Sequence, residues 1–277
     1  MKLDLSVGRG TKTLLLGSPG SGKTYSINTL IKAGLEVAVI ITDPDGDVTL
    51  LDAVRNLNLP RNKLHLRYIS AAASSWDALK DSARRINLMD YKSLTEIKAG
   101  IAKDKYGQFL DLLDCLSNFR SDDGVVLGPV DSWGPERALV IDSLSGLNMM
   151  AMALMIGGKP AAHQGEWGVA MNAEEQLIYK LCADLKCFFV LTSHLDKEMD
   201  EVLGKPQFMA AALGRKLAPK LPRLFSDVIL AYREGDRFWW STSAVDVDLK
   251  TRTLPLRSKI DPDFGQIVEA WRKRNDN

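Results

Sequence analysis

Residues 17–24 read GSPGSGKT and directly follow an apolar run at residues 14–16. The spacing G-x-x-x-x-G-K-T is that of a phosphate-binding loop, or P-loop. A strand-like run precedes the loop, and residues 24–31 can begin a helix behind it, which is the context in which such a loop operates. A glycine-rich turn with an incidental lysine is the alternative. The pattern and its context predict a strand, a phosphate-binding loop and a helix in succession.

The residue types in this loop indicate how it would hold a nucleoside triphosphate. Glycines let the backbone turn tightly and point successive N–H groups toward an anion, and the dipole of the following helix adds to the attraction. Lys23 is expected to reach the β- and γ-phosphates, and the Thr24 hydroxyl is expected to ligate Mg²⁺. The residues expected to contact the nucleotide are Gly17, Ser18, Pro19, Gly20, Ser21, Gly22, Lys23, Thr24 and Tyr25.

Short apolar runs separated by helical stretches predict the α/β fold class. Such runs are typical of buried parallel strands, and their alternation with helices implies a mostly parallel sheet with helices on both faces. The expected strands are residues 13–16, 37–41, 64–69, 138–141, 188–191 and 228–232. An apolar stripe predicts a helix over residues 173–185. Alternation around a turn at residues 234–236 predicts an antiparallel hairpin at the edge of the sheet.

Residues 74–136 are the least regular part of the chain. Residues 76–89 and 94–119 have helical patterns, whereas residues 121–136 are rich in turn formers and predict a surface loop. We interpret the whole span as a helical insertion before the next core strand. Residues 1–277 are then expected to form a single domain.

The composition argues against several classes of protein. The net charge is only +1, so any contact with nucleic acid must come from a local patch rather than from overall charge. Cys115, Cys182 and Cys187 are odd in number and predict reduced thiols rather than a disulfide frame. Three scattered histidines and the lack of a CxxC pair make a zinc site unexpected. The chain begins without a signal-peptide pattern, and its longest apolar stretch, residues 149–156, is too short to cross a bilayer. A cytoplasmic protein with no membrane contact is expected.

Asp142 is the candidate for the second metal ligand. It follows the apolar run at residues 138–141, which places it at the carboxyl end of a core strand, where parallel α/β sheets bind ligands. A carboxylate at that point would hold the water shell of Mg²⁺. An N-cap for the helix that begins near Ser143 is the alternative, and the two roles are compatible. We therefore expect Thr24 and Asp142 to be the metal ligands.

Hydrolysis also needs a group that orients or deprotonates the attacking water. Asp43 and Asp45 follow the apolar run at residues 37–41, again at the end of a strand. The same segment, Asp-Pro-Asp-Gly, is also strong turn chemistry. The sequence does not choose between the two aspartates, or between a catalytic aspartate and a plain turn.

Two further groups of polar residues are candidates for the γ-phosphate. The run at residues 188–191 continues as Thr-Ser-His, and the segment ending at His194 could sense the γ-phosphate or simply cap a strand. Lys250 and Arg252 lie two residues apart, so in an extended strand both side chains leave the same face. They predict an arginine finger that acts in trans on another subunit. The alternative is that the two charges keep an exposed edge strand from pairing with another chain.

Together, these segments resemble the RecA-fold ATPases, and more narrowly a phage-type group of RecA-like recombination and single-strand annealing ATPases, described as AAA-family ATP-binding proteins. The resemblance is carried by GSPGSGKT (17–24), ALVIDSLSGL (138–147), GEWGVAMNAEEQLIYKL (165–181), FFVLTSHLD (188–196) and LPRLFSDVILAY (221–232). It covers nearly the whole chain except residues 74–136. It implies a RecA-like P-loop NTPase core, ATP and Mg²⁺ as cofactors, single-stranded DNA as a partner, and a homo-oligomeric ring or filament.

The chain departs from RecA itself in two respects. The catalytic glutamate of that protein is replaced, if at all, by Asp43 or Asp45. A separate C-terminal DNA-binding domain is not evident either. The resemblance therefore implies ATP binding but not strand exchange.

Local charge suggests where DNA would bind. The first candidate is the loop at residues 196–226, because its part from residue 202 onward carries basic residues and no acid. The second candidate is residues 157–167, where Trp167 could stack on a base beside Lys159 and His163. Each could equally be a solvated loop. The basic residues of the first candidate are Lys197, Lys205, Arg215, Lys216, Lys220 and Arg223.

The sequence thus predicts a Mg²⁺-dependent ATPase that acts on single-stranded DNA in recombination, annealing or replication, in the host cytoplasm if the chain is phage-encoded. The main rival is a P-loop nucleotide switch or assembly ATPase with a protein partner and no nucleic acid. A small-molecule kinase is a weaker third possibility, because neither an acceptor pocket nor a cluster of lid arginines is visible.

Overall fold

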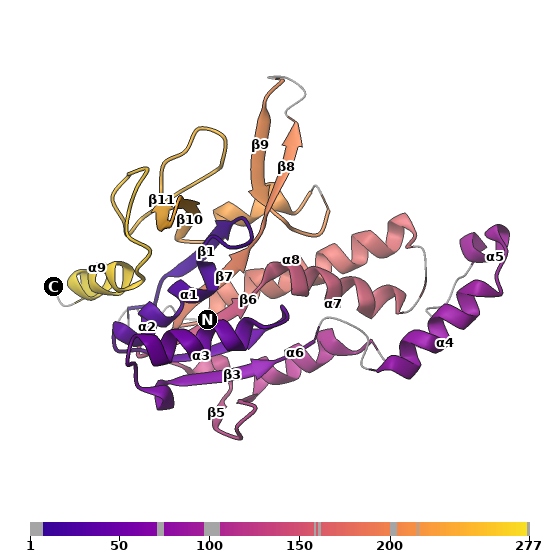
Figure 1. Ribbon diagram of the computed structural model, residues 1–277, viewed down its shortest axis with the longest axis horizontal. Coiled ribbons are helices and arrows are strands. Elements are labelled where there is room, and N and C mark those ends of the chain that lie inside the picture. Colours follow the sequence, from indigo (N-terminus) through magenta and orange to yellow (C-terminus); the bar gives the residue numbers. More distant parts are fainter. Residues whose placement is uncertain are drawn as a thin grey trace.

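The computed structural model describes residues 8–70, 75–96, 106–157, 159, 162–199, 204–214 and 216–275. In this part of the chain, seven strands form one sheet in the order β11-β10-β1-β7-β6-β2-β3 (Figure 1). All neighbours in it are parallel except β10 and β11, which form the antiparallel hairpin at one edge. The strands are β1 (Lys12–Gly17), β2 (Glu36–Ile41), β3 (Leu64–Tyr68), β6 (Arg137–Asp142), β7 (Phe188–Ser193), β10 (Asp227–Glu234) and β11 (Arg237–Ser241). The predicted α/β class is confirmed.

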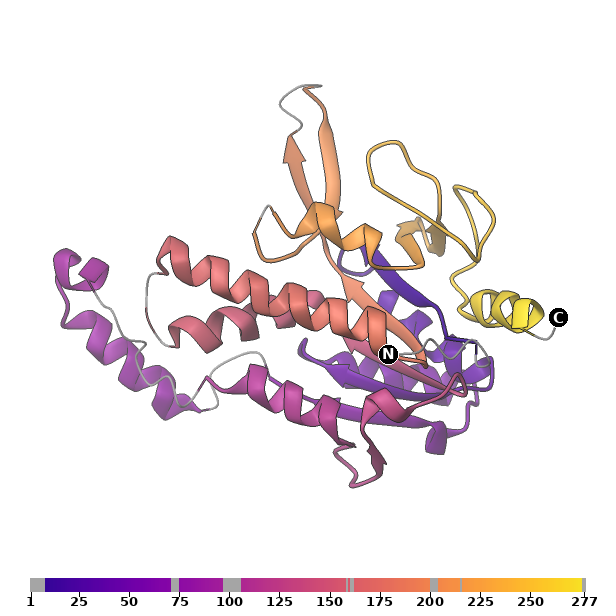
Figure 2. The ribbon, with the colours of Figure 1, turned by 180° about the vertical axis from the view of Figure 1, so that it is seen from behind.

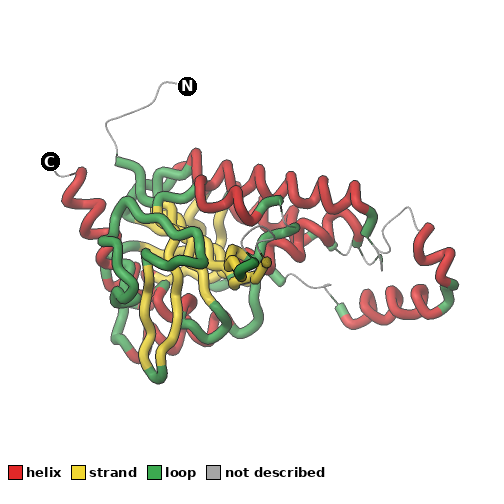
Figure 3. Tube along the Cα trace, turned by 90° about the horizontal axis from the view of Figure 1, so that it is seen from above, coloured by secondary structure: helices red, strands yellow, loops and turns green. Residues whose placement is uncertain are grey.

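Helices cover both faces of the sheet because the side chains of each buried strand alternate between two apolar layers (Figures 2 and 3). Leu14 and Leu16 belong to one layer and Leu15 to the other. The first layer is completed by α6 (Gln108–Ser117), α7 (Leu144–Ile156), α8 (Gln164–Asp184) and the 3₁₀ turn η4 (Ala218–Arg223). The second is completed by α2 (Asn28–Lys32), α3 (Gly46–Asn56) and α9 (Gly265–Asn275), together with Ile27, which follows the short helix α1 (Lys23–Ser26). A short 3₁₀ turn, η1 (Arg61–Lys63), precedes β3.

The strand order decides where functional side chains can meet. Strand β7 lies between β1 and β6, with Leu16 beside Ser193 and Ile141 beside Leu191. Because these strands are parallel, their carboxyl ends lie along one edge of the sheet. The P-loop, Asp142 and the residues that follow β2 and β7 are therefore neighbours.

The span 74–136 contains less helix than the sequence predicted. It comprises α4 (Trp76–Asn87), α5 (Tyr91–Glu96), α6, the short strands β4 (Phe119–Arg120) and β5 (Val126–Gly128), and the 3₁₀ turn η3 (Val130–Ser132). The expected helix 94–119 is wrong at its end, because α6 stops at Ser117 and Phe119 begins a strand. Part of the expected helix, residues 97–105, falls outside the described residues. In Figures 1 and 2, α4 and α5 extend away from the sheet.

The expected surface loop at residues 121–136 is also partly wrong. Trp133 and Val130 are buried in the apolar layer that contains α6 and α7. The Trp133 ring packs edge-on against Phe119 with centroids 5.6 Å apart, and its indole N–H donates to the Leu127 carbonyl at 3.0 Å. Burial of a large aromatic surface stabilises this segment more than its many turn formers loosen it.

The three cysteines are free thiols. Burial raises the pKa of Cys115 and Cys187 to about 11 and that of Cys182 to about 12. In the described parts of the chain, we find no helix with both the length and the apolar character needed to span a membrane.

Glu174 is an unusual residue of α8, because its carboxyl group faces the core. The residue is fully buried, and neither carboxyl oxygen has a hydrogen-bond partner within the described chain. It shares the buried side of the helix with Ala170, Leu177 and Ile178. Burial raises the pKa of Glu174 to about 8, since the charged form loses its hydration and gains no partner.

This environment predicts that stability falls as pH rises. The native protein keeps the proton on Glu174 up to about pH 8, whereas the unfolded chain releases it near the ordinary value of 4.5. Between these limits the native state binds more protons, so the free energy of unfolding should fall with pH by up to about 1.4 kcal/mol per unit from this group. Glu174→Gln removes the titration and should flatten the pH dependence of the denaturation midpoint between pH 5 and 8.

Glu175→Gln is the matched control, since Glu175 is partly exposed and ion-paired with Lys220. It should leave the falling slope in place. Parallel pH profiles for wild-type protein and Glu174→Gln would show that the buried carboxyl is charged and has found a partner.

Candidate nucleotide-binding site

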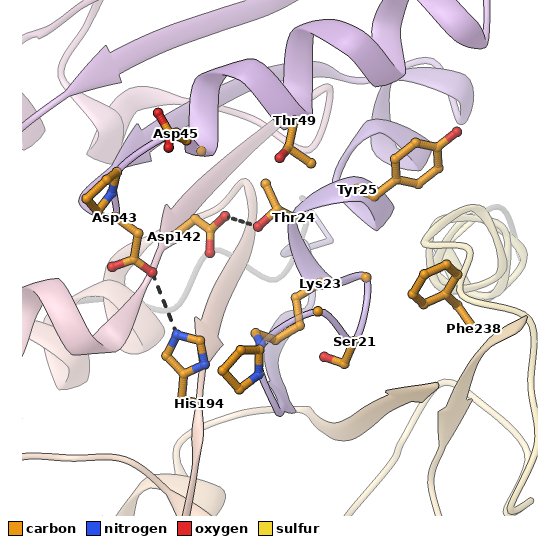
Figure 4. Close-up of a pocket in the computed structure, with 15 residues that line it drawn as sticks. Ser21, Lys23, Thr24, Tyr25, Asp43, Asp45, Thr49, Asp142, His194 and Phe238 are labelled. Carbon is orange, nitrogen blue, oxygen red and sulfur yellow. Dashed lines mark hydrogen bonds and ion pairs between the residues drawn. The ribbon is translucent and has the colours of Figure 1, made fainter. Parts of the chain in front are cut away.

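A pocket of about 450 Å³ opens at the carboxyl edge of the sheet (Figure 4). It is lined by residues 19–25 of the P-loop, residues 43–46 after β2, Thr49 of α3, Asp142, His194 and Phe238. The structure thus brings residues 19–25 of the expected P-loop segment together with Asp43, Asp45, Asp142 and His194, whereas Gly17 and Ser18 do not line the pocket.

The conformation of the P-loop explains its glycines. Gly20 and Gly22 have φ angles of 71° and 84°, a region that favours glycine. A Cβ atom on Gly22 would also lie 2.9 Å from the Phe238 ring, and one on Gly17 would lie 2.5 Å from the Ala231 carbonyl oxygen. The sharp turn and the close approach of two neighbouring strands both depend on these positions.

The loop leaves backbone N–H groups free for a ligand. Helix α1 begins after Gly22 without a side-chain cap, and within the described residues no hydrogen bond is made by the N–H groups of Gly20, Gly22 and Lys23. Ile27 keeps helical dihedral angles, φ −54° and ψ −35°, so α1 and α2 follow each other without a turn. Unpaired N–H groups at the start of a helix favour an anion.

Lys23 is held inside the loop. Its ammonium group donates hydrogen bonds to the carbonyl oxygens of Gly17 at 2.8 Å and Ser18 at 3.0 Å, and the residue is buried. Burial lowers the pKa of Lys23, while the carboxylates of Asp142 and Asp43 raise it. The cation therefore lies between the loop and the two carboxylates, where it can neutralise bound phosphates.

Asp142 faces the P-loop at the end of β6. The Thr24 hydroxyl donates to Asp142 Oδ2 at 2.7 Å, and the Thr192 hydroxyl donates to Oδ1. Burial raises the pKa of Asp142, and these two hydrogen bonds lower it. The N-cap of α7 is Ser143 rather than Asp142, so the alternative role of Asp142 as the helix cap is wrong.

The pair Thr24 and Asp142 suits a Mg²⁺ ion that is coordinated mainly by phosphates and water. Their oxygens are adjacent, as two ligands of one ion must be. In the described ranges, no cluster of three or more His, Cys, Asp or Glu side chains could hold a metal by itself. Mg²⁺ is commonly bound by one or two carboxylates together with substrate phosphates and water, so these residues fit it.

Asp43 and Asp45 have different surroundings. Ser143 Oγ donates to Asp43 Oδ2 at 2.7 Å, and His194 Nε2 lies 3.9 Å from the same oxygen. Asp45 is exposed, has a φ angle of 62° and precedes α3 without capping it. Figure 4 shows Asp43 turned toward Asp142 and His194.

The opposite side of the pocket is aromatic. Tyr25 and Phe238 are both somewhat less than half exposed and lie across the P-loop from the aspartates (Figure 4). Phe238 comes from β11 and was not among the expected site residues. The sequence signalled only the edge strand that carries it, since its approach to Gly22 depends on the pairing of β11 with β10.

The end of β7 lies between the P-loop and Asp142. Thr192 is fully buried and bonded to Asp142. His194 Nδ1 is buried and has no hydrogen-bond partner in the described chain, while its other ring nitrogen faces Asp43. The predicted role of this strand end as a γ-phosphate sensor stays a prediction.

Lys250 and Arg252 lie at the amino-terminal ends of the sheet strands, away from the P-loop. Lys250 pairs with Val228 near the start of β10, and its ammonium group donates to the Pro222 carbonyl at 2.9 Å. The P-loop begins at the opposite end of the neighbouring strand. These cations can reach a P-loop only in another copy of the chain, and that role also stays a prediction.

The described residues of the first candidate DNA segment, residues 196–226, mostly form strands and a 3₁₀ turn rather than a loop. The segment contains an antiparallel hairpin of β8 (Leu195–Met199) and β9 (Pro206–Ala210), which projects from the sheet in Figure 1, followed by η4. Glu175 of α8 lies 2.7 Å from Lys220 and 3.7 Å from Arg223. Arg215 lies outside the described residues. Two of the expected cations are thus already ion-paired.

The second candidate, residues 157–167, ends in the first turn of α8. A capping box of His163 and Glu166 begins the helix at Gln164, well before the expected residue 173. The Lys159 side chain is fully buried and lies 2.8 Å from Glu166. Trp167 is exposed, but the cation expected beside it is not available to DNA.

No protein-family model matches the sequence, and no curated protein matches it. Among solved structures, the chain is similar to a prototypical ATPase from the type III secretion system of pathogenic bacteria, with 14% sequence identity and a TM-score of 0.34. The match covers 81% of this chain and 52% of that one, so the chain spans about half the length of that ATPase. The site is therefore interpreted from its own residues.

Proposed function

We propose that the chain is a Mg²⁺-dependent ATPase. The observation that carries the proposal is the contact of 2.7 Å between Thr24 Oγ1 and Asp142 Oδ2, directly behind a P-loop that holds a buried lysine. A glycine-rich turn with an incidental lysine would need neither a buried carboxylate beside it nor unpaired N–H groups. Together these groups match the phosphates and the metal ion of a nucleoside triphosphate.

The two sides of the pocket would hold different parts of the nucleotide. The N–H groups of the P-loop and Lys23 would bind the β- and γ-phosphates, and Thr24 and Asp142 would hold Mg²⁺, whose charge stabilises the phosphates during transfer. The base would lie against Tyr25 and Phe238, which offer aromatic surface on the other side. Residues 17–25 are thus proposed as the nucleotide-binding segment.

Asp43 is proposed to orient the attacking water. It is fixed by Ser143 and close to His194, whereas Asp45 is exposed and turned outward. The water oxygen would form a bond to the γ-phosphorus, the bond from that phosphorus to the bridging oxygen would break, and ADP and phosphate would leave. Asp43 would accept the hydrogen bond, and finally the proton, of the attacking water.

Asp43→Asn should lower ATP turnover by about 100-fold, the scale of a lost general base. Asp45→Asn is the matched control, because it removes the same charge two residues away and should leave turnover near the wild-type rate. Steady-state phosphate release measures both. The reverse order of effects would transfer the role to Asp45, and two unaffected variants would exclude both.

Assembly is proposed because the pocket lacks an arginine. Among the described residues that line it, Lys23 and His194 are the basic side chains. Phosphoryl transfer is commonly assisted by an arginine that a neighbouring subunit supplies. A homo-oligomeric ring or filament, with Lys250 or Arg252 reaching the next subunit, would supply a cation for this role.

The proposed partner is single-stranded DNA. The rival proposal is an assembly ATPase whose partner is another protein. The β8–β9 hairpin follows directly on β7, whose end lies in the nucleotide site. Its described residues carry Asp196 and Glu198 against Lys197 and Lys205, so the hairpin has no net attraction for a nucleic-acid backbone. This balance suits a protein partner. A pocket at the amino-terminal ends of the strands, lined by Arg9, Arg252 and Arg274, suits DNA.

ATP turnover with and without single-stranded DNA separates these proposals. Mg²⁺-dependent phosphate release that DNA accelerates supports the DNA-handling ATPase. Turnover that DNA leaves unchanged, together with no DNA affinity at low salt, supports the protein-bound ATPase instead. Absence of ATP binding at millimolar Mg²⁺ would refute the ATPase proposal itself.

A further inference from the structure

A second pocket, of about 350 Å³, lies at the amino-terminal edge of the sheet, opposite the P-loop. It is formed where β1 and β10 begin and where α9 packs beside them. Residues 9–12 and Ser226 form one part of its wall, and Arg252, Thr253, Trp271 and Arg274 form another.

The lining of this pocket is strongly basic. Arg9, Lys12, Arg252 and Arg274 line it, and none of its described lining residues is an aspartate or glutamate. The Lys12 ammonium group is buried and already donates to the carbonyl oxygens of Gly10 and Cys187, so the arginines carry the attraction. The chain as a whole has a net charge of only +1, so three arginines in one pocket are a local concentration of charge. Such a pocket attracts an anion.

Within the described residues, the three arginines are not neutralised by carboxylates. Arg9 donates to the Ala183 carbonyl at 2.7 Å and Arg274 to the Ala270 carbonyl at 3.4 Å, and no salt bridge in the described ranges involves either residue or Arg252. Their situation differs from that of Lys220 and Arg223, which share Glu175.

Asp227, which directly follows Ser226 of the wall, is occupied elsewhere. It is buried and accepts hydrogen bonds from the Thr251 hydroxyl at 2.7 Å and from the backbone N–H groups of Arg252 at 2.9 Å and Thr253 at 3.1 Å. These contacts order the segment that carries Arg252. They leave the guanidinium group of Arg252 free to meet a ligand.

The other groups in the pocket indicate a ligand with phosphates and a flat ring. Trp271 lines the pocket and is only partly buried, with its ring supported edge-on by Phe188 at a centroid distance of 5.4 Å. Thr11 also lines it, and its hydroxyl oxygen is buried with no partner in the described chain. Guanidinium groups pair with phosphate oxygens through parallel hydrogen bonds, and an indole ring can stack on a base.

We propose that this pocket binds the phosphate groups of single-stranded nucleic acid, through Arg9, Arg252 and Arg274, with a base against Trp271. The proposal names where the proposed DNA partner binds, so it rests on that part of the function but not on ATP hydrolysis. It assigns Arg252 to this pocket, which leaves Lys250 as the cation for a neighbouring subunit. It moves the DNA contact away from residues 196–226 and 157–167, whose cations are partly consumed by ion pairs.

The test is the affinity of the full chain for a short labelled oligothymidylate, measured by fluorescence anisotropy without nucleotide over a range of salt. The variant Arg252→Ala with Arg274→Ala should bind about tenfold more weakly or worse, and its salt slope should flatten by about 1.4, since each single-strand phosphate contact contributes about 0.7. Arg84→Ala with Arg85→Ala is the matched control, because it removes two exposed arginines from α4. The control should retain the affinity of the wild type.

Equal affinity and slope in the wild type and the Arg252 and Arg274 variant, both folded by circular dichroism, would overturn the proposal. Competition by inorganic phosphate and by thymidine monophosphate identifies the source of the phosphate. If these bind but the oligonucleotide does not, the site serves a free small anion and the nucleic-acid proposal is wrong.

Two other results would reassign the pocket. Binding that is lost in Lys23→Ala but kept in the double variant would place the oligonucleotide in the P-loop. Self-association that is lost in the double variant, with unchanged oligonucleotide affinity, would show that the pocket holds a second copy of the chain. ATP turnover is measured separately, so a failure of the ATPase proposal would not be mistaken for a failure here.

Discussion

Lys23→Ala should remove most ATP binding while the fold survives. The ammonium group is the one strong cation inside the P-loop, and its contacts are with the carbonyl oxygens of Gly17 and Ser18 rather than with the apolar layers. A lost charge-assisted contact to the β- and γ-phosphates should weaken binding by about 100-fold. Titration with a fluorescent ATP analogue measures the change, and circular dichroism checks the fold.

Lys32→Ala is the matched control. Lys32 ends α2, is largely exposed and lies 3.4 Å from Asp263. Its removal should leave the affinity for the analogue unchanged. Wild-type affinity in Lys23→Ala would refute the assignment of the P-loop as the triphosphate site.

Asp142→Asn should reduce ATP hydrolysis by about 100-fold or more, with a smaller loss of nucleotide binding. Asparagine keeps the shape of the side chain and can still bond to Thr24 and Thr192, but it lacks the charge that would order Mg²⁺. Electrostatic stabilisation of the transferring phosphate commonly contributes rate factors of about 100 to 1,000. Phosphate release at several Mg²⁺ concentrations measures the effect.

Thermal unfolding separates this catalytic role from a structural one. Burial raises the pKa of Asp142, so a neutral side chain at this position should not lower the melting temperature. Asp52→Asn, in an exposed ion pair on α3, controls for the loss of one negative charge. An unchanged turnover rate in Asp142→Asn would exclude Asp142 as a metal ligand.

The P-loop could be predicted from sequence because the groups that form it are contiguous. The N–H groups, the lysine and the first helix all come from a few consecutive residues, so local spacing is sufficient. The fold class could be predicted for a related reason, since short apolar runs between helices have few other solutions than a mostly parallel sheet. Asp43, Asp142 and His194 were found because they follow such runs.

The contacts among these residues needed the strand order. Only the placement of β7 between β1 and β6 brings Thr192 onto Asp142, and only the return of β2 beside β6 brings Asp43 near His194. Phe238 reaches the P-loop because β11 pairs with β10 at the end of the chain. Segments far apart in sequence meet here through backbone pairing. The residue pattern of an individual β-strand does not specify which strand it pairs with.

The sequence by itself therefore determined the α/β class, the P-loop and the strand ends that surround it. The tertiary structure alone decided which cations are free. Lys220 is neutralised by Glu175, 45 residues away, whereas Arg9, Arg252 and Arg274 gather from both ends of the chain in a pocket whose described lining has no acid. The physical reason is that the charge a ligand meets depends on side chains within a few ångströms in space, and the order of residues along the chain does not give that distance.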